Sequence, residues 1–186
     1  MDKYVVLLRG INVGGKNKVK MADLRTELIK EGFDTVQTYI QSGNIVVESN
    51  LVSETITQKV ATLLTQKFTL DTTSIKILTL NKESYELVIA EAPENYGRVD
   101  QTVDYRYDVL FLIDITVEEA MKEVETRGGI DQSWCGTKVI YYRRPGPTHP
   151  DYTKSALSKL AKKNIYQSMT VRNWKTTTRL WEMIQT

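Results

Sequence analysis

The segment from Arg9 to Lys18 holds the residue types in this chain that are best suited to binding an anion. Gly10, Gly15 and Lys16 have the spacing G-x-x-x-x-G-K, the core of the loop in which backbone N–H groups cradle phosphates. Consecutive glycines let N–H groups turn toward one anion, and neighbouring cations add charge. We therefore expect an anion site formed by Arg9, Gly10, Asn12, Gly14, Gly15, Lys16, Asn17 and Lys18.

The match to a nucleotide triphosphatase loop stops after Lys16. Asn17 stands where Ser or Thr supplies a hydroxyl to Mg²⁺, and the next helix is expected only from Met21. A helix that begins so late does not direct its N-terminus at a phosphate held by the loop. We expect no Mg²⁺-dependent ATPase or GTPase; the alternative to an anion site is a loop whose glycines only turn the chain.

Two later segments have similar composition. Asp151 to Ser155 is expected to begin a basic helix, where Lys154 and Ser155 add donors to outward N–H groups. The second segment, residues 171–178, offers Arg172, Asn173 and Lys175 at the start of the last helix, and Asn44 adds a donor at a hairpin exit. For both segments the alternative is helix capping on a solvated basic face.

The distribution of charge supports a positive pole. The net charge is +2, yet residues 1–20 carry five Lys or Arg and one Asp, and residues 138–186 carry ten Lys or Arg and two acids. The middle carries ten basic and twenty acidic residues. We expect the two basic segments, 9–18 and 152–176, to share one surface that attracts anions.

These segments require a scaffold, and the first half of the chain predicts one. The apolar run 4–8 predicts a strand buried on both faces, and Met21, Leu24 and Leu28 have the spacing of an amphipathic helix. Two strands, 35–41 and 44–48, are expected to turn at Gly43, followed by a helix and a strand over 75–79. The order is βαββαβ.

The second half repeats this order. Residues 109–113 predict a buried strand, Thr116 to Glu119 form a capping-box pattern, and 133–135 with 138–143 predict a hairpin. A helix over 151–161 and a strand over 168–172 complete the unit. We predict an α+β fold of two tandem ferredoxin-like units with antiparallel sheets: 1–80, a linker helix and loop over 81–104, and 105–186 with a C-terminal helix.

Three blocks closely resemble an uncharacterised bacterial family known as domain of unknown function 1697. They are RGINVGGKNKVKMADLR (9–25), TYIQSGNIV (38–46) and TVRNWKTTTRL (170–180). The resemblance implies a pair of plait-like units in tandem and no established activity. Relatives often carry an Arg-Ser-Lys-Leu-like block before the penultimate helix, and here Tyr152 stands in place of that arginine.

Other chemistry finds little support in the sequence. With one cysteine, Cys135, and one histidine, His149, no Cys/His zinc cluster fits within the chain, and we expect no metal or other cofactor. No apolar run suits a membrane span and no signal-peptide cleavage pattern is present, so we expect a soluble, cytoplasmic protein.

Three functions follow from these features. The first is a binder of phosphate-bearing ligands, nucleotide or nucleic acid, on the basic face. The second is an enzyme that acts on a small anionic substrate held by Arg, Lys and Asn side chains. The third is a protein-interaction module that uses sheet edges or the acidic middle of the chain.

Overall fold

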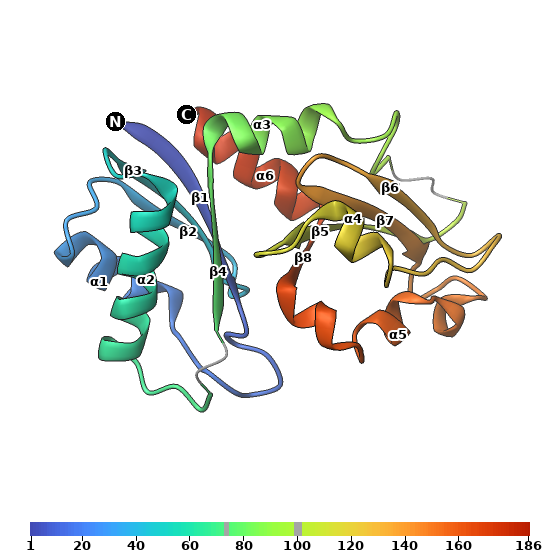
Figure 1. The fold of residues 1–186 in the computed structure, drawn as a ribbon, viewed down its shortest axis with the longest axis horizontal. Coiled ribbons are helices and arrows are strands. Elements are labelled where there is room, and N and C mark those ends of the chain that lie inside the picture. Colours follow the sequence, from blue (N-terminus) through green and yellow to red (C-terminus); the bar gives the residue numbers. More distant parts are fainter. Residues whose placement is uncertain (73–74, 99–101) are drawn as a thin grey trace. The chain divides into compact units, whose positions relative to one another are not determined.

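The computed structural model describes residues 1–72, 75–98 and 102–186, so part of the expected 81–104 linker, residues 99–101, lies outside the described residues. The chain divides into two compact units, one formed by residues 1–86 with 180–186 and the other by residues 87–179 (Figure 1). Each unit contains one four-stranded antiparallel sheet, which confirms the predicted α+β fold.

The first unit has the predicted βαββαβ order. Its elements are β1 (Asp2–Arg9), α1 (Met21–Lys30), β2 (Val36–Tyr39), β3 (Asn44–Ser49), α2 (Ser53–Lys67) and β4 (Lys76–Asn81). The strand order is β2-β3-β1-β4, with β1 antiparallel to both of its neighbours. This arrangement brings the end of β1, the β2–β3 turn and the start of β4 to the same end of the sheet.

Both faces of β1 are buried, as its unbroken apolar run predicted. Val6 and Leu8 face α1 and α2 and pack with Leu24 and Val60, while Val5 on the other face is fully buried. Figure 1 shows α1 and α2 beside each other on one face of this sheet. The core fixes the sheet and the two helices, so the loops at the end of β1 start from rigid elements.

The second unit repeats the order with shorter helices. Its elements are β5 (Tyr105–Leu112), α4 (Val117–Met121), β6 (Gln132–Cys135), β7 (Val139–Pro145), α5 (Leu157–Leu160) and β8 (Met169–Asn173), with 3₁₀ turns at Tyr152–Lys154 and Asn164–Ser168. The strand order is β6-β7-β5-β8. Thr116 forms the predicted capping box with Glu119. Leu110, Ile140 and Tyr142 pack under α4 and α5.

The continuous helix expected over 151–161 is wrong. Ser155 has an extended backbone with φ −60° and ψ 136°, and it separates a 3₁₀ turn from the four-residue α5. The Asp131 carboxylate accepts the Ala156 N–H at 2.7 Å, and the Ser155 hydroxyl accepts the Leu157 N–H at 3.2 Å. These side-chain acceptors replace the carbonyls that a helix would supply, so the chain breaks at Ser155.

Two helices complete the chain, α3 (Lys82–Ala90) and α6 (Trp174–Gln185). Each begins after an asparagine that caps its N-terminus. The Asn81 side chain accepts the Ser84 N–H at 2.9 Å, and the Asn173 side chain accepts the Thr176 N–H at 2.8 Å.

Candidate anion-binding site

The β1–α1 loop is a small hairpin rather than a phosphate-binding turn before a helix. The Lys16 N–H donates to the Val13 carbonyl at 3.1 Å, and the Asn12 N–H donates to the Asn17 carbonyl at 3.1 Å. Gly14 and Gly15 at the tip have φ of 58° and 77°. Two successive positive φ values define a type I′ turn, for which glycine is well suited. Lys16 is exposed beside this turn.

The Asn12 side chain holds the hairpin to its surroundings. Its Nδ2 donates to the carbonyls of Val19 and Gln41 at 2.8 and 2.9 Å, and its Oδ1 accepts the Val19 N–H at 2.8 Å. The amide therefore joins the loop both to the approach to α1 and to the β2–β3 turn. Its place in the site is to support the loop.

Asn17 has the same role at the base of the loop, where it is buried. Its Nδ2 donates to the Gly10 carbonyl at 2.8 Å and to the Thr72 hydroxyl at 3.0 Å. Its Oδ1 accepts the Thr72 N–H at 3.0 Å. Asn12 and Asn17 therefore hold the loop in place, because most of the hydrogen-bond donors and acceptors of their side-chain amides are used.

A carboxylate of the protein already binds one N–H group of this loop. The Asn17 N–H donates to Oδ2 of Asp71 at 2.6 Å. In the sequence pattern of a phosphate-binding loop, this N–H follows the lysine and faces the ligand. Because Asp71 already accepts the Asn17 N–H, this N–H is not free to bind a phosphate. This is a second difference from a nucleotide triphosphatase loop, beside the missing hydroxyl at residue 17.

The β2–β3 turn lies beside the loop. Asn44 is fully buried, and its Nδ2 donates to the Tyr39 carbonyl at 3.0 Å and the Ser42 hydroxyl at 2.9 Å. Gly43 has φ 78°, and a Cβ there would lie 2.7 Å from Cβ of Leu8, so glycine is required. Ile40 at the tip is half exposed and has φ 48°, a strained conformation for a β-branched residue.

Basic residues surround these two turns. Arg9 pairs with Lys76 across β1 and β4, so both cations begin at the same end of the sheet. Lys16 and Lys18 are exposed, and within residues 1–72, 75–98 and 102–186 neither forms an ion pair. Of the predicted residues in this unit, Arg9, Lys16 and Lys18 supply charge, whereas the three asparagines and the glycines shape the backbone.

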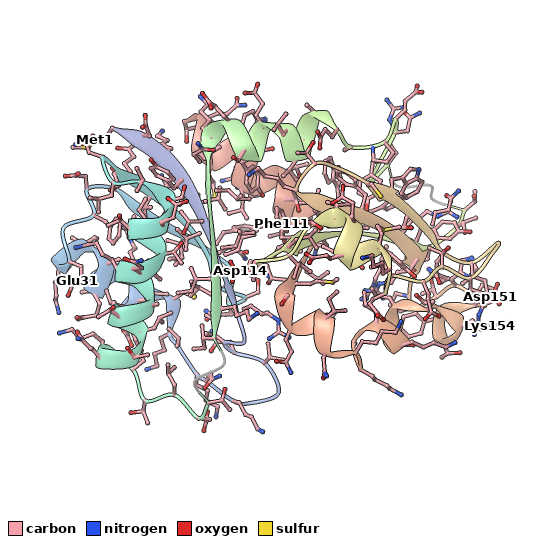
Figure 2. The ribbon with its side chains drawn as sticks, in the orientation of Figure 1. Met1, Glu31, Phe111, Asp114, Asp151 and Lys154 are labelled. Carbon is pink, nitrogen blue, oxygen red and sulfur yellow. The ribbon has the colours of Figure 1, made fainter. Side chains whose placement is uncertain are left out.

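In the second unit, Lys154 and Ser155 lie on the broken segment before α5. Nζ of Lys154 pairs with Oδ1 of Asp151 at 2.7 Å, and Figure 2 labels both residues. Because the expected helix is absent there, these residues do not stand at a helix N-terminus. Ser155 instead lines a cavity of about 370 Å³.

That cavity lies against the helix-covered face of the second sheet. Arg144 lines it, together with Tyr152, Thr153, Ser155, Leu157, Ser158, Ala161 and Tyr166. Nε of Arg144 donates to Oδ2 of Asp108 at 2.6 Å, and the Asp108 side chain is almost fully buried. Tyr142 packs near Ser155, and its burial raises the pKa of its hydroxyl. The Asp131 carboxylate raises this pKa further, whereas the hydrogen bond with Ser155 lowers it.

The remaining predicted residues, Arg172, Asn173 and Lys175, do not join this cavity. Arg172 is buried, and Nη1 donates to the Thr170 hydroxyl and the Val171 carbonyl, each at 2.9 Å. It pairs with Val109 across the sheet, whereas the cavity residue Arg144 shares the face of Leu110 and Tyr142. Side chains alternate along strands, so Arg172 points to the opposite face. Asn173 caps α6, and Lys175 is exposed in its first turn.

Two residues that shape the second site carry a signal in the sequence that could have located them. Asp108 and Arg144 occupy core-facing positions in two neighbouring strands, where alternation calls for apolar side chains. Opposite charges at such positions indicate a buried pair. Asp71 carried no local signal, because its partner lies 54 residues earlier in the chain.

Fold and site together define a protein of two ferredoxin-like units with a rigid basic loop in the first unit. Among protein families, the model of a family of unknown function, DUF1697, matches residues 1–141. The chain belongs to this family. The first two blocks quoted above fall inside the matched residues, and the block at 170–180 lies beyond them.

A solved structure agrees with this assignment. The conserved bacterial protein SP0830 from Streptococcus pneumoniae is 29% identical in sequence, with a TM-score of 0.82. The similarity covers 100% of this chain and 99% of that protein. No curated protein matches the chain. Among the described residues, no helix has both the length and the apolar character needed to cross a membrane.

Proposed function

We propose that this protein binds a phosphate-bearing ligand, a nucleotide or a nucleic acid, through the basic loop of residues 9–20. The observation that carries the proposal is the exposed pair Lys16 and Lys18 on a loop that Asn12 and Asn17 hold rigid. A rigid loop loses little backbone entropy when a ligand binds to its lysines.

The surroundings of the loop favour an extended polyanion over a single phosphate group. In the described part of the chain, two cavities lie away from the loop: that of the second unit, and one of about 460 Å³ beside Lys3 and Lys82. The loop instead projects cations from an open surface that also carries the exposed side chains of Val13 and Ile40. Lysines contact backbone phosphates, and apolar side chains contact sugars and bases. A nucleic acid therefore fits this surface best.

The proposal includes the cellular compartment of the protein. Cys135 is a free, exposed thiol, which suits a reducing compartment, and we place the protein in a bacterial cytoplasm. Nucleic acids and nucleotides are abundant there.

A thermal-shift screen tests the proposal. The wild type is screened against oligonucleotides, nucleotides and sugar phosphates at about 50 and about 200 mM salt. We expect an oligonucleotide to stabilise the protein at low salt, with less effect at high salt and in the variant carrying both Lys16→Gln and Lys18→Gln. The matched control is Lys82→Gln, an exposed lysine that follows Asn81 at the opposite end of β1. A shift that the two lysines do not affect would contradict the proposal.

A further inference from the structure

Arg144, which lines the cavity of the second unit, uses only part of its guanidinium group to bind Asp108. Nε of Arg144 binds Asp108, and in the described part of the chain its two Nη groups have no hydrogen-bond partner. An arginine that serves only to neutralise a carboxylate commonly binds it with two parallel N–H groups. Here a single N–H does so, and the outer edge of the guanidinium remains available.

The buried partner fixes where that edge points. The Asp108 side chain is 6% exposed and that of Arg144 is 21% exposed, so the pair is anchored on its Asp108 side. Arg144 lines the cavity, and its accessible Nη groups therefore face the cavity or the solvent at its mouth. A planar pair of Nη donors matches the two oxygens of a carboxylate or phosphate group.

The rest of the lining suits a small ligand with one such group. Thr153, Ser155, Ser158, Tyr152 and Tyr166 bring hydroxyls, and Leu157 and Ala161 bring apolar surface. A volume of about 370 Å³ is within the range of small-molecule sites. Residues 152–163, which border the cavity, carry four lysines and no acid. Lys154 pairs with Asp151, and Lys163 pairs with Glu123 and Glu125, so Lys159 and Lys162 supply the positive charge of this segment that can attract an anion.

We propose that this cavity binds a small organic molecule by a terminal oxyanion group, phosphate or carboxylate, held on the Nη edge of Arg144. Asp108 is a positioning residue that orients the guanidinium. The aromatic and aliphatic lining contacts the body of the ligand. This site is independent of the basic loop, because it lies in the other compact unit and shares no residue with that loop.

Amide chemical shifts measured by NMR during titration locate binding directly. The probes are phenyl phosphate, benzoate and the neutral benzyl alcohol. We expect saturable shifts at Arg144 and residues 152–158 with at least one anion and none with benzyl alcohol. A stronger response to phenyl phosphate assigns a phosphate ligand, and a stronger response to benzoate assigns a carboxylate ligand.

Two variants separate the site from general effects on folding. Arg144→Lys keeps the charge but loses the paired donors, and we expect affinity to fall about tenfold or more. Ala161→Phe fills the cavity without touching the ion pair and should abolish binding. The control Gln132→Phe adds the same ring on the opposite face of the sheet, at a position that pairs with Arg143. Anion shifts that survive in both variants, equal shifts with benzyl alcohol, or no shifts at Arg144 and 152–158 would overturn the proposal.

Discussion

The backbone N–H of Asn17 donates to the carboxylate of Asp71 over 2.6 Å, across 54 residues of sequence. The contact ties the loop after β1 to the segment that leads into β4. It also places a negative charge against a loop whose exposed side chains are positive. The Asp71 carboxylate thus holds the loop backbone and weakens the positive field of Lys16 and Lys18.

Asp71→Asn separates these two effects. The amide oxygen can still accept the Asn17 N–H, while the negative charge is removed. We expect oligonucleotide affinity to rise about two- to threefold, as for one unit charge in a water-exposed setting. Fluorescence anisotropy measures the change, with Asp34→Asn as a control of equal charge on an exposed residue before β2. A lower affinity in Asp71→Asn would show that the carboxylate assists binding.

Asn17→Ala tests the support of the loop. The substitution removes the side-chain bonds to Gly10 and Thr72 and leaves their backbone groups without these partners. We expect the free energy of unfolding to fall by about 3 kcal/mol. Urea denaturation measures it, and Gln66→Ala on the exposed face of α2 is the control. A loss as small as that of the control would mean that the loop does not depend on Asn17.

Gly97→Ala tests the packing of Trp174 in the second unit. Gly97 has φ 75°, and an added Cβ would overlap Cδ1 of Trp174. The indole also meets the Tyr96 ring edge-on, with the ring centres 5.2 Å apart, so it has little freedom to move. We expect a loss of about 3 kcal/mol or more in stability. Gly128→Ala, where nothing lies within 4 Å of the added Cβ, should change stability little. Equal thermal shifts for the two variants would contradict this packing.

We expect three buried tyrosines to set the alkaline limit of stability. Burial raises the pKa of Tyr96, Tyr141 and Tyr142 above the ordinary value of 10.0. Because each of these pKa values is higher in the folded state than in the unfolded state, the tyrosines contribute fully to the free energy of unfolding below pH 10. This contribution is lost as the pH rises above 10. We expect their phenolate absorbance to appear together with the loss of circular dichroism. The exposed Tyr152, replaced by Phe, is the control. Titration of all tyrosines before unfolding would refute this assignment.

The fold could be predicted because its signals are local. The apolar run of β1, the turn at Gly43 and the capping box at Thr116 each lie within a few residues of sequence. The helix expected over 151–161 failed for the opposite reason. Leu157, Leu160 and Ala161 have helical spacing, but Asp131, 25 residues away, binds the Ala156 N–H and breaks the helix.

The candidate site divides in the same way. Residue type and spacing identified the basic loop and its glycines, since both depend on adjacent residues. The sequence did not reveal that Asn12 and Asn17 support the loop, because Gln41 and Thr72 are distant partners. Ligand contact and structural support require the same side-chain amides, so only the folded chain distinguishes the two roles.

The salt dependence of oligonucleotide binding tests the central claim most directly. The logarithm of the affinity of a single-stranded oligonucleotide is plotted against the logarithm of the salt concentration. Each lost phosphate contact on a single strand reduces the steepness of this line by about 0.7. For the variant with Lys16→Gln and Lys18→Gln, we predict a line shallower by about 1.4, while Lys82→Gln keeps the wild-type slope. A slope that is unchanged in the double variant, or reduced equally in Lys82→Gln, would contradict binding at the loop.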